Sequence, residues 1–357
     1  MIRNELLIIL ICILLFGCKS NKDYKSIKSD TQYDKYAEIN THEYNQRNPP
    51  GIFFPDKNEY MLFTTNFEDL LRYPDIESLT ITGWTGDMDL SFLEFYPRLK
   101  TLSISNCEEI SNLEPLKYLV GLECLMISGL CGDELSYIEN MKNLRILKIS
   151  IFNYTVNYEL VIFDEINFEP IGKLSNLEYI NIFCNNRIDT GFLISLINLK
   201  ELAISTTSEF DLSDVGTLPN LEILLINSGN YLNNISSLKN ISLKRLVLMN
   251  GMRHSNDKLW IKTVKQELNF NWLLNLINLE EIVINDMNIN DVRPLLELPN
   301  LKSLEIEDIN VDILMPLIES NTLERICIDP AYYYDFPKEI FEERGINIGK
   351  TWDDMGE

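Results

Sequence analysis

Histidine, cysteine and glycine, which supply many catalytic, metal-binding and phosphate-binding motifs, form no such motif in this sequence. The 357 residues include two histidines, His42 and His254, and neither is placed to form a Ser-His or Cys-His pair. The 15 glycines are scattered and do not form a spaced phosphate-binding cluster, and the seven cysteines lack zinc-ligand spacing. An enzyme needs a positioned acid, base, nucleophile or metal. The sequence therefore predicts a protein that is not an enzyme and that uses no metal or cofactor.

The charge of the chain argues against several classes of partner. Asp and Glu number 54 against 31 Lys and Arg, which gives a formal net charge of −23. A nucleic-acid-binding surface needs Lys and Arg to displace counterions from phosphates, and an anionic membrane surface attracts the same residues. We expect no nucleic-acid partner and no small-molecule substrate. A cationic partner or simple solubility is compatible with the charge.

Cys18 lies in a context that predicts covalent modification. An apolar run from Leu6 to Phe16 is shorter than the about 20 residues that span a bilayer, and it suits the core of a signal peptide. Gly17-Cys18 follows, which resembles the bacterial lipobox, where a small residue precedes a cysteine that is lipidated and becomes the mature N-terminus. The resemblance implies a signal peptide over residues 1–17 and an acyl chain such as palmitate on Cys18. An ordinary secretory peptide or an uncleaved anchor is the alternative.

An acylated Cys18 would tether the protein to a membrane of the cell envelope, either in the periplasm or on the surface of the outer membrane. Disulfides can form in those compartments. Five cysteines remain after the signal peptide and the lipid site: Cys107, Cys124, Cys131, Cys184 and Cys327. This odd number at irregular spacing is not a disulfide framework, so we expect buried free thiols. A bond between Cys107 and Cys131 is the alternative, because both occupy similar positions in adjacent repeats.

A repeated hexad, Leu-x-x-Leu-x-Leu or a close variant, organises most of the chain. It begins at Ile76, Leu99, Leu122, Leu144, Leu177, Leu199, Leu221, Leu243, Leu279, Leu301 and Leu323, at intervals of 23, 23, 22, 33, 22, 22, 22, 36, 22 and 22 residues. A fixed period in the low twenties with this pattern is the signature of a leucine-rich repeat solenoid. We predict an α/β solenoid over residues 76–329, a horseshoe of about eleven repeats. Its concave side would be a parallel β-sheet, and its convex returns would be short and irregular or helical.

The repeats resemble those of a known family. Each hexad is expected to be a short strand whose first, fourth and sixth residues enter the core. The stretch from Ile289 to Leu301, with Val-Arg-Pro-Leu and then Leu-Pro-Asn-Leu, resembles the 22-residue repeats of internalins and related bacterial leucine-rich repeat proteins. The usual asparagine after the strand is kept at Asn185 but is replaced in other repeats, so we expect no continuous ladder there. The replacing residues are Trp84, Cys107, Met287 and Ile309.

The second residue of the hexad alternates in charge through all eleven repeats. The residues are Glu77, Lys100, Glu123, Arg145, Glu178, Lys200, Glu222, Lys244, Glu280, Lys302 and Glu324. Parallel strands stack about 4.8 Å apart, so each charge would lie between two opposite ones. Such neighbours contribute roughly 0.2–1 kcal/mol a pair. We expect this charge ladder to be structural, and its continuity across both long intervals supports the assigned register.

Two inserts lengthen the array. In the first, near 151–165, apolar residues alternate from Phe152 to Ile162, which predicts a strand or hairpin. The second, near 250–269, is a basic patch with one tryptophan. Such inserts either contribute to the binding side of a solenoid or are tolerated surface loops. The basic or aromatic residues of the second insert are Arg253, His254, Lys258, Trp260, Lys262 and Lys265.

The remaining segments are expected to flank and cap the array. Residues 18–50 are polar and poor in aliphatic side chains, which predicts a flexible stalk. Residues 51–75 should form an N-terminal cap, with a strand at Tyr60–Phe63 and a helix starting near Asn66. Residues 330–357 should form a C-terminal cap and tail, in which the segment 338–344 is a short helix that Gly345 ends.

The third and fifth residues of each hexad, and the seventh residue, which directly follows the hexad, should point out of the concave sheet. They are small or polar in the outer repeats and largely apolar in the middle, with charged neighbours such as Lys148. This is the anatomy of a protein-binding surface. The alternative is the general preference of strands for aliphatic residues. The predicted protein-binding residues are Ile146, Tyr179, Phe183, Glu201, Ile223, Leu225, Arg245, Val247, Met249, Glu281 and Val283.

Together these features predict an envelope-anchored leucine-rich repeat protein that binds a protein partner through its concave face. The resemblance to internalins implies adhesion or host interaction. The alternative is a structural or self-assembling envelope component without a soluble ligand.

Overall fold

The computed structural model describes residues 51–351, with gaps at 55–58, 63–69, 71–72, 85–86, 106, 108, 131–134, 152–154, 157–158, 161–165, 185, 229–231, 240–241, 251–265 and 308. Cys18, the segments predicted to be a signal peptide and a stalk, and most of the second insert lie outside the described residues, as does the helix expected near Asn66. Among the described residues, no helix has the length and apolarity to cross a membrane.

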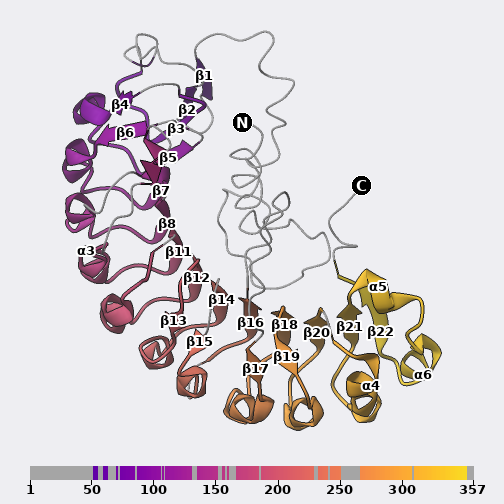
Figure 1. Cartoon of the computed structure of the whole chain (residues 1–357). Helices are drawn as coiled ribbons and strands as arrows, with labels where there is room; N and C mark the ends of the chain where they lie inside the picture. Colours follow the sequence, from indigo (N-terminus) through magenta and orange to yellow (C-terminus); the bar gives the residue numbers. More distant parts are fainter. Residues whose placement is uncertain are drawn as a thin grey trace.

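The chain forms a horseshoe with one long β-sheet on its inner side and short helices on its outer side (Figure 1). This confirms the predicted solenoid. The sheet has 14 strands, and every neighbouring pair is parallel except β1 and β2. Its strands are β1 (Gly51–Phe54), β2 (Glu59–Leu62), β3 (Ser78–Thr82), β5 (Thr101–Ser105), β7 (Cys124–Leu130), β8 (Ile146–Ile151), β11 (Tyr179–Cys184), β12 (Glu201–Thr206), β14 (Ile223–Ser228), β16 (Arg245–Asn250), β18 (Glu281–Asn285), β20 (Ser303–Ile306), β21 (Arg325–Ile328) and β22 (Asn347–Lys350).

The hexad builds the core as expected, but the strand is displaced within it. Leu199, Leu202 and Ile204, the first, fourth and sixth residues of one hexad, are at most 1% exposed. However, β12 begins at Glu201, the third residue, and the other repeats show the same offset. The expectation that the whole hexad is a strand was therefore wrong by two residues. The charged second residue lies just before the strand and not within it.

The convex returns are short, each with no more than one or two turns of helix, and several of them begin with a capped turn. Asp89, Asp189 and Asn269 accept a hydrogen bond from the backbone N–H two residues later, which is how an N-cap satisfies a free amide. The helices are η3 (Leu90–Phe95), η4 (Glu114–Tyr118), η5 (Ser136–Ile138), α3 (Glu169–Gly172), η6 (Thr190–Ser195), η7 (Val215–Thr217), η8 (Ile235–Ser237), η9 (Phe270–Asn275), η10 (Arg293–Glu297), α4 (Val311–Leu314) and η11 (Met315–Glu319).

Short parallel strand pairs join some of the turns between sheet and helices. They are β4 (Asp87–Asp89) with β6 (Glu109–Asn112), β13 (Phe210–Asp211) with β15 (Leu232–Asn233), and β17 (Glu267–Leu268) with β19 (Asn288–Ile289). The positions at which related repeats stack an asparagine hold buried Trp84, Cys107, Met287 and Ile309. These side chains extend the hydrophobic core, so the expected interruption of that ladder is confirmed at these four positions.

The first insert contains a hairpin, as its alternating pattern predicted. β9 (Thr155–Val156) and β10 (Glu159–Leu160) pair antiparallel, with Val156 opposite Glu159. At the N-terminal end, β2 confirms the strand expected near Tyr60 and pairs in parallel with β3. β1, which the sequence did not predict, adds an antiparallel strand to the end of the sheet.

The C-terminal cap contains α5 (Pro330–Tyr333), α6 (Lys338–Glu342) and the last strand, β22. α6 confirms the predicted short helix. It ends before Gly345, whose φ of +81° is the left-handed conformation that glycine adopts readily.

Candidate binding face of the concave sheet

The parallel register places the predicted binding residues in three rows across β8 to β18. Side chains of a strand alternate between its two faces, and these rows lie on the face opposite the hydrophobic core. The first row contains Ile146, Tyr179, Glu201, Ile223, Arg245 and Glu281. The second contains Lys148, Asn181, Ala203, Leu225, Val247 and Val283, and the third Ser150, Phe183, Ser205, Asn227, Met249 and Asn285.

An apolar area occupies the middle of these rows. Leu225 is the register neighbour of Ala203 on one side and of Val247 on the other, and Val247 adjoins Val283. The structure thus brings together residues that lie up to 80 positions apart in the sequence. Val247 and Val283 are buried, like Phe183 in the third row, whereas Ile223, Leu225 and Met249 are half-buried. A partner would first meet the half-buried residues.

The charged residues near the apolar area have partners within the chain. Arg245 Nε lies 3.0 Å from Glu281 Oε2, and the Glu281 side chain is 16% exposed. Lys148 Nζ lies 4.9 Å from the centroid of the Tyr179 ring, a cation–π contact that orients the ring. Two of the predicted binding residues, Tyr179 and Arg245, are therefore held in place by contacts within the chain.

A set of buried polar groups in the third row was missed by the sequence reasoning. Ser205, Asn227 and Asn285 are buried, and within the described part of the chain Ser205 Oγ and the Oδ1 atoms of both asparagines have no hydrogen-bond partner. A buried polar atom without a partner is destabilising by about 1–3 kcal/mol. The signal was available, since all three residues occupy the seventh position of the hexad phrase. The sequence-based prediction of binding residues considered mainly the apolar residues of the same strands and did not include these three.

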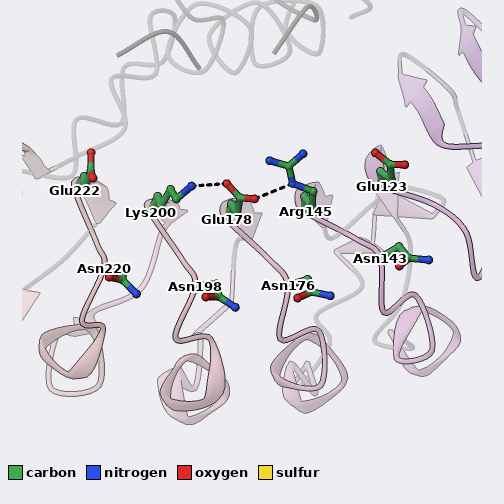
Figure 2. Close-up of a pocket in the computed structure, with 9 residues that line it drawn as sticks. All are labelled: Glu123, Asn143, Arg145, Asn176, Glu178, Asn198, Lys200, Asn220 and Glu222. Atoms are coloured by element: carbon green, nitrogen blue, oxygen red, sulfur yellow. Dashed lines mark hydrogen bonds and ion pairs between the residues drawn. The ribbon is translucent and has the colours of Figure 1, made fainter. Parts of the chain in front are cut away.

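A polar groove of about 590 Å³ follows the edge of the sheet where β7 to β14 begin. The charge ladder forms one side of it, and asparagines that directly precede the hexads form the other (Figure 2). Each asparagine donates its side-chain amide to a backbone carbonyl of the preceding turn. The donor–acceptor pairs are Asn143–Val120, Asn176–Lys142, Asn198–Ser175 and Asn220–Ile197, with Asn300–Ile277 repeating the contact further along. In the sequence, the asparagine of the Leu-Pro-Asn-Leu phrase marks this position.

The charge ladder is continuous, as the sequence predicted. The backbone N–H of Lys200 donates to the carbonyl of Glu178, and that of Glu222 donates to Lys200, both at 2.8 Å. Ion pairs form at five of the ten steps: Glu77–Lys100, Arg145–Glu178, Glu178–Lys200, Glu222–Lys244 and Glu280–Lys302. Among the described residues of the ladder, Glu178 is the one that forms ion pairs with both of its neighbours. The hydrogen bond from Arg145 lowers the pKa of Glu178, and Lys200 adds to this effect.

The described cysteines are buried free thiols, which confirms that expectation for Cys107, Cys124, Cys184 and Cys327. Cys131 lies outside the described residues. Burial raises the pKa of Cys124 to about 12 and that of Cys107 to about 11. Within the described part of the chain, no three His, Cys, Asp or Glu residues are grouped to hold a metal ion.

The long parallel sheet, the eleven hexads and the short convex helices define a leucine-rich repeat solenoid. An internalin from Listeria monocytogenes has a similar structure, with a TM-score of 0.53 and 17% sequence identity over 84% of each chain. A leucine-rich repeat protein from Leptospira interrogans matches with a TM-score of 0.51 and 14% identity, over 82% of this chain and 77% of the other.

No model of a known protein family matches the sequence, and no curated protein matches it either. At these low identities the structural similarity establishes the fold.

Proposed function

We propose that this protein is an envelope-anchored binding protein that recognises a protein partner through the middle of its concave sheet. The observation that supports this most is the contiguous apolar area around Ile223, Leu225 and Val247, with Tyr179 and Arg245 beside it. Aromatic and arginine side chains at the centre of a surface are the usual energetic anchors of protein interfaces.

The N-terminal end of the same rows supports a localised site. β3 and β5 carry Ser78, Thr80 and Ser103 in the rows where the middle strands carry aliphatic and aromatic residues. A general preference of strands for aliphatic residues would act on every repeat. The restriction of apolar side chains to the middle therefore favours binding over strand propensity.

The test compares partner capture by two matched triple variants. Tyr179→Ala/Ile223→Ala/Leu225→Ala removes half-buried side chains from the apolar area, and Ser78→Ala/Thr80→Ala/Ser103→Ala changes the polar end. Crosslinking followed by quantitative mass spectrometry should show at least a tenfold loss of captured partner for the first variant and no loss for the second. Equal capture by both variants would exclude the concave centre. Capture of this chain alone would favour the structural, self-assembling alternative.

Lipidation at Cys18 is part of the proposal and has its own test. Wild type should incorporate labelled palmitate and remain with the membrane fraction, and Cys18→Ser should do neither. If both forms remain unlabelled, the segment 1–17 is an ordinary secretory peptide or an uncleaved anchor. With a lipid anchor or a secretory peptide, the partner would meet the protein outside the cytoplasm. The resemblance to internalin repeats suggests adhesion or host interaction.

A further inference from the structure

The polar groove beside the charge ladder is limited to a few consecutive turns. An asparagine directly precedes the hexad in four successive repeats, and these four side chains line one side of the groove. The turn before this series has Gly121 at the same position, and the turn after it has Ser242. The groove therefore has two ends that the sequence itself defines. The four residues are Asn143, Asn176, Asn198 and Asn220.

Each of these asparagines keeps unused hydrogen-bonding capacity. The side chain of Asn176 donates to the carbonyl of Lys142 at 2.7 Å, and the other three make the equivalent contact. A side-chain amide has two hydrogens to donate and an oxygen that accepts. All four side chains are exposed, and within the described part of the chain their oxygens accept no hydrogen bond. The groove thus presents a donor and an acceptor once per turn, held in place by the backbone contact.

The other side of the groove is formed by five residues of the charge ladder, and their charges nearly cancel. Three of them are acids and two are bases, Arg145 and Lys200, which leaves a net charge of −1. Both bases pair with Glu178, so the charges largely neutralise one another within the protein. Such a surface attracts neither a polyanion nor a polycation. It suits a polar ligand without charge.

The spacing of the turns favours a particular kind of polymer. The hydrogen-bonding groups recur with the strands, about 4.8 Å apart, whereas an extended peptide repeats its side chains on one face only about every 6.6 Å. A peptide would therefore lose register with the groove after two turns. A pyranose joined through C1 and C4 spans close to the separation of two turns, and β-linkage keeps such a chain extended.

We propose that this groove binds a glycan of uncharged, β-1,4-linked sugars, with one sugar on each turn. Sugar hydroxyls donate to the asparagine oxygens. They accept from the remaining amide hydrogens and from Arg145 and Lys200 on the opposite side (Figure 2). The groove lies where the strands begin, outside the apolar area of the concave sheet, so the glycan site is independent of the proposed protein-binding site.

The first test is a length series with the full-length wild-type protein, so it does not depend on how a variant folds. Chito-oligosaccharides of two to seven sugars are titrated and followed by NMR, which detects weak binding. Affinity should rise at least tenfold from the disaccharide to the pentasaccharide, because each added sugar reaches another turn. It should change less than twofold from the pentasaccharide to the heptasaccharide, because the groove ends at Gly121 and Ser242.

Two further sugars define the chemistry that the groove recognises. Maltopentaose, whose α-1,4 linkages coil the chain, should bind at least tenfold more weakly than chitopentaose. Cellopentaose, which is β-1,4-linked but lacks N-acetyl groups, determines whether those groups contribute, and binding of either β-linked pentasaccharide supports the site.

The second test compares two matched double variants. Arg145→Gln/Lys200→Gln removes both cations of the groove and should weaken binding of chitopentaose at least tenfold. Lys100→Gln/Lys302→Gln is the control, since both lysines belong to the same ladder, each forms one ion pair and neither lines the groove. It should bind like wild type.

Four results would overturn the site. They are no binding of either β-linked pentasaccharide, equal binding of maltopentaose, an affinity that does not rise with length, and wild-type binding by Arg145→Gln/Lys200→Gln with an unchanged melting temperature.

Discussion

Arg145 Nε lies 2.7 Å from Glu178 Oε1, although 33 residues separate the two and the first insert lies between them. Lys200 Nζ lies 2.7 Å from the other carboxylate oxygen of Glu178. The insert therefore leaves the solenoid between two turns without shifting their register, and Glu178 joins three consecutive turns.

Replacement of Glu178 tests how much this junction stabilises the array. Glu178→Gln removes two charge pairs, each contributing roughly 0.2–1 kcal/mol, so we expect a loss of about 0.5–2 kcal/mol in the free energy of unfolding. Glu123→Gln is the control, since Glu123 occupies the same ladder and forms no ion pair within the described residues. Urea denaturation measures both. A Glu178→Gln protein as stable as the control would show that the two ion pairs of Glu178 contribute nothing.

The same residue should make stability depend on pH. The pKa of Glu178 is lower in the folded protein than its ordinary value of 4.5, because Arg145 and Lys200 favour the carboxylate. Its contribution is therefore complete above about pH 4.5 and is lost as the pH falls through the folded pKa. The stability difference between wild type and Glu178→Gln should shrink when thermal melts are repeated at increasing acidity below that value. A difference that stays constant would contradict the assigned cause.

Gly216 lies where two turns approach closely, so we expect it to resist substitution. A Cβ added there would lie 2.2 Å from the carbonyl oxygen of Ser237 on the next turn. Gly216→Ala should cost about 1–3 kcal/mol, because the backbone must move to relieve the overlap. Gly121→Ala, where no atom lies within 4 Å of the added Cβ, should be neutral or stabilising by up to about 1 kcal/mol. Equal melting temperatures for the two variants would contradict the close approach.

The buried thiols should be inert in the folded protein. Burial raises the pKa of Cys124 to about 12 and that of Cys184 to about 11, so the reactive thiolate is scarce near neutral pH. In a variant with Cys12, Cys18 and Cys131 replaced by Ser, the thiol reagent DTNB should react with no thiol before denaturant is added and with four afterwards. Rapid reaction of one thiol in the native state would locate a site of local opening.

Much of the fold followed from the hexad alone. In a solenoid each turn contacts only its neighbours, so a sequence offset of 22 residues becomes a contact in space. That is why Glu178 and Lys200 could be paired from the sequence, and why the core positions of Leu199 and Leu202 were predictable. The alternation of charge also supported the register that the hexads assigned across both inserts.

The sequence could not determine how deeply each side chain is buried. It also could not determine the contacts between residues that the repeat offset of 22 residues does not relate. Val247 and Leu225 occupy the same strand position, yet one is buried and the other half-buried. The contact of Lys338 and Lys350 with Tyr333 joins a helix and a strand beyond the last hexad, where the offset of 22 residues no longer applies. Local periodicity fixed the neighbours of each turn, and only the three-dimensional packing decided which side chains remain available to bind.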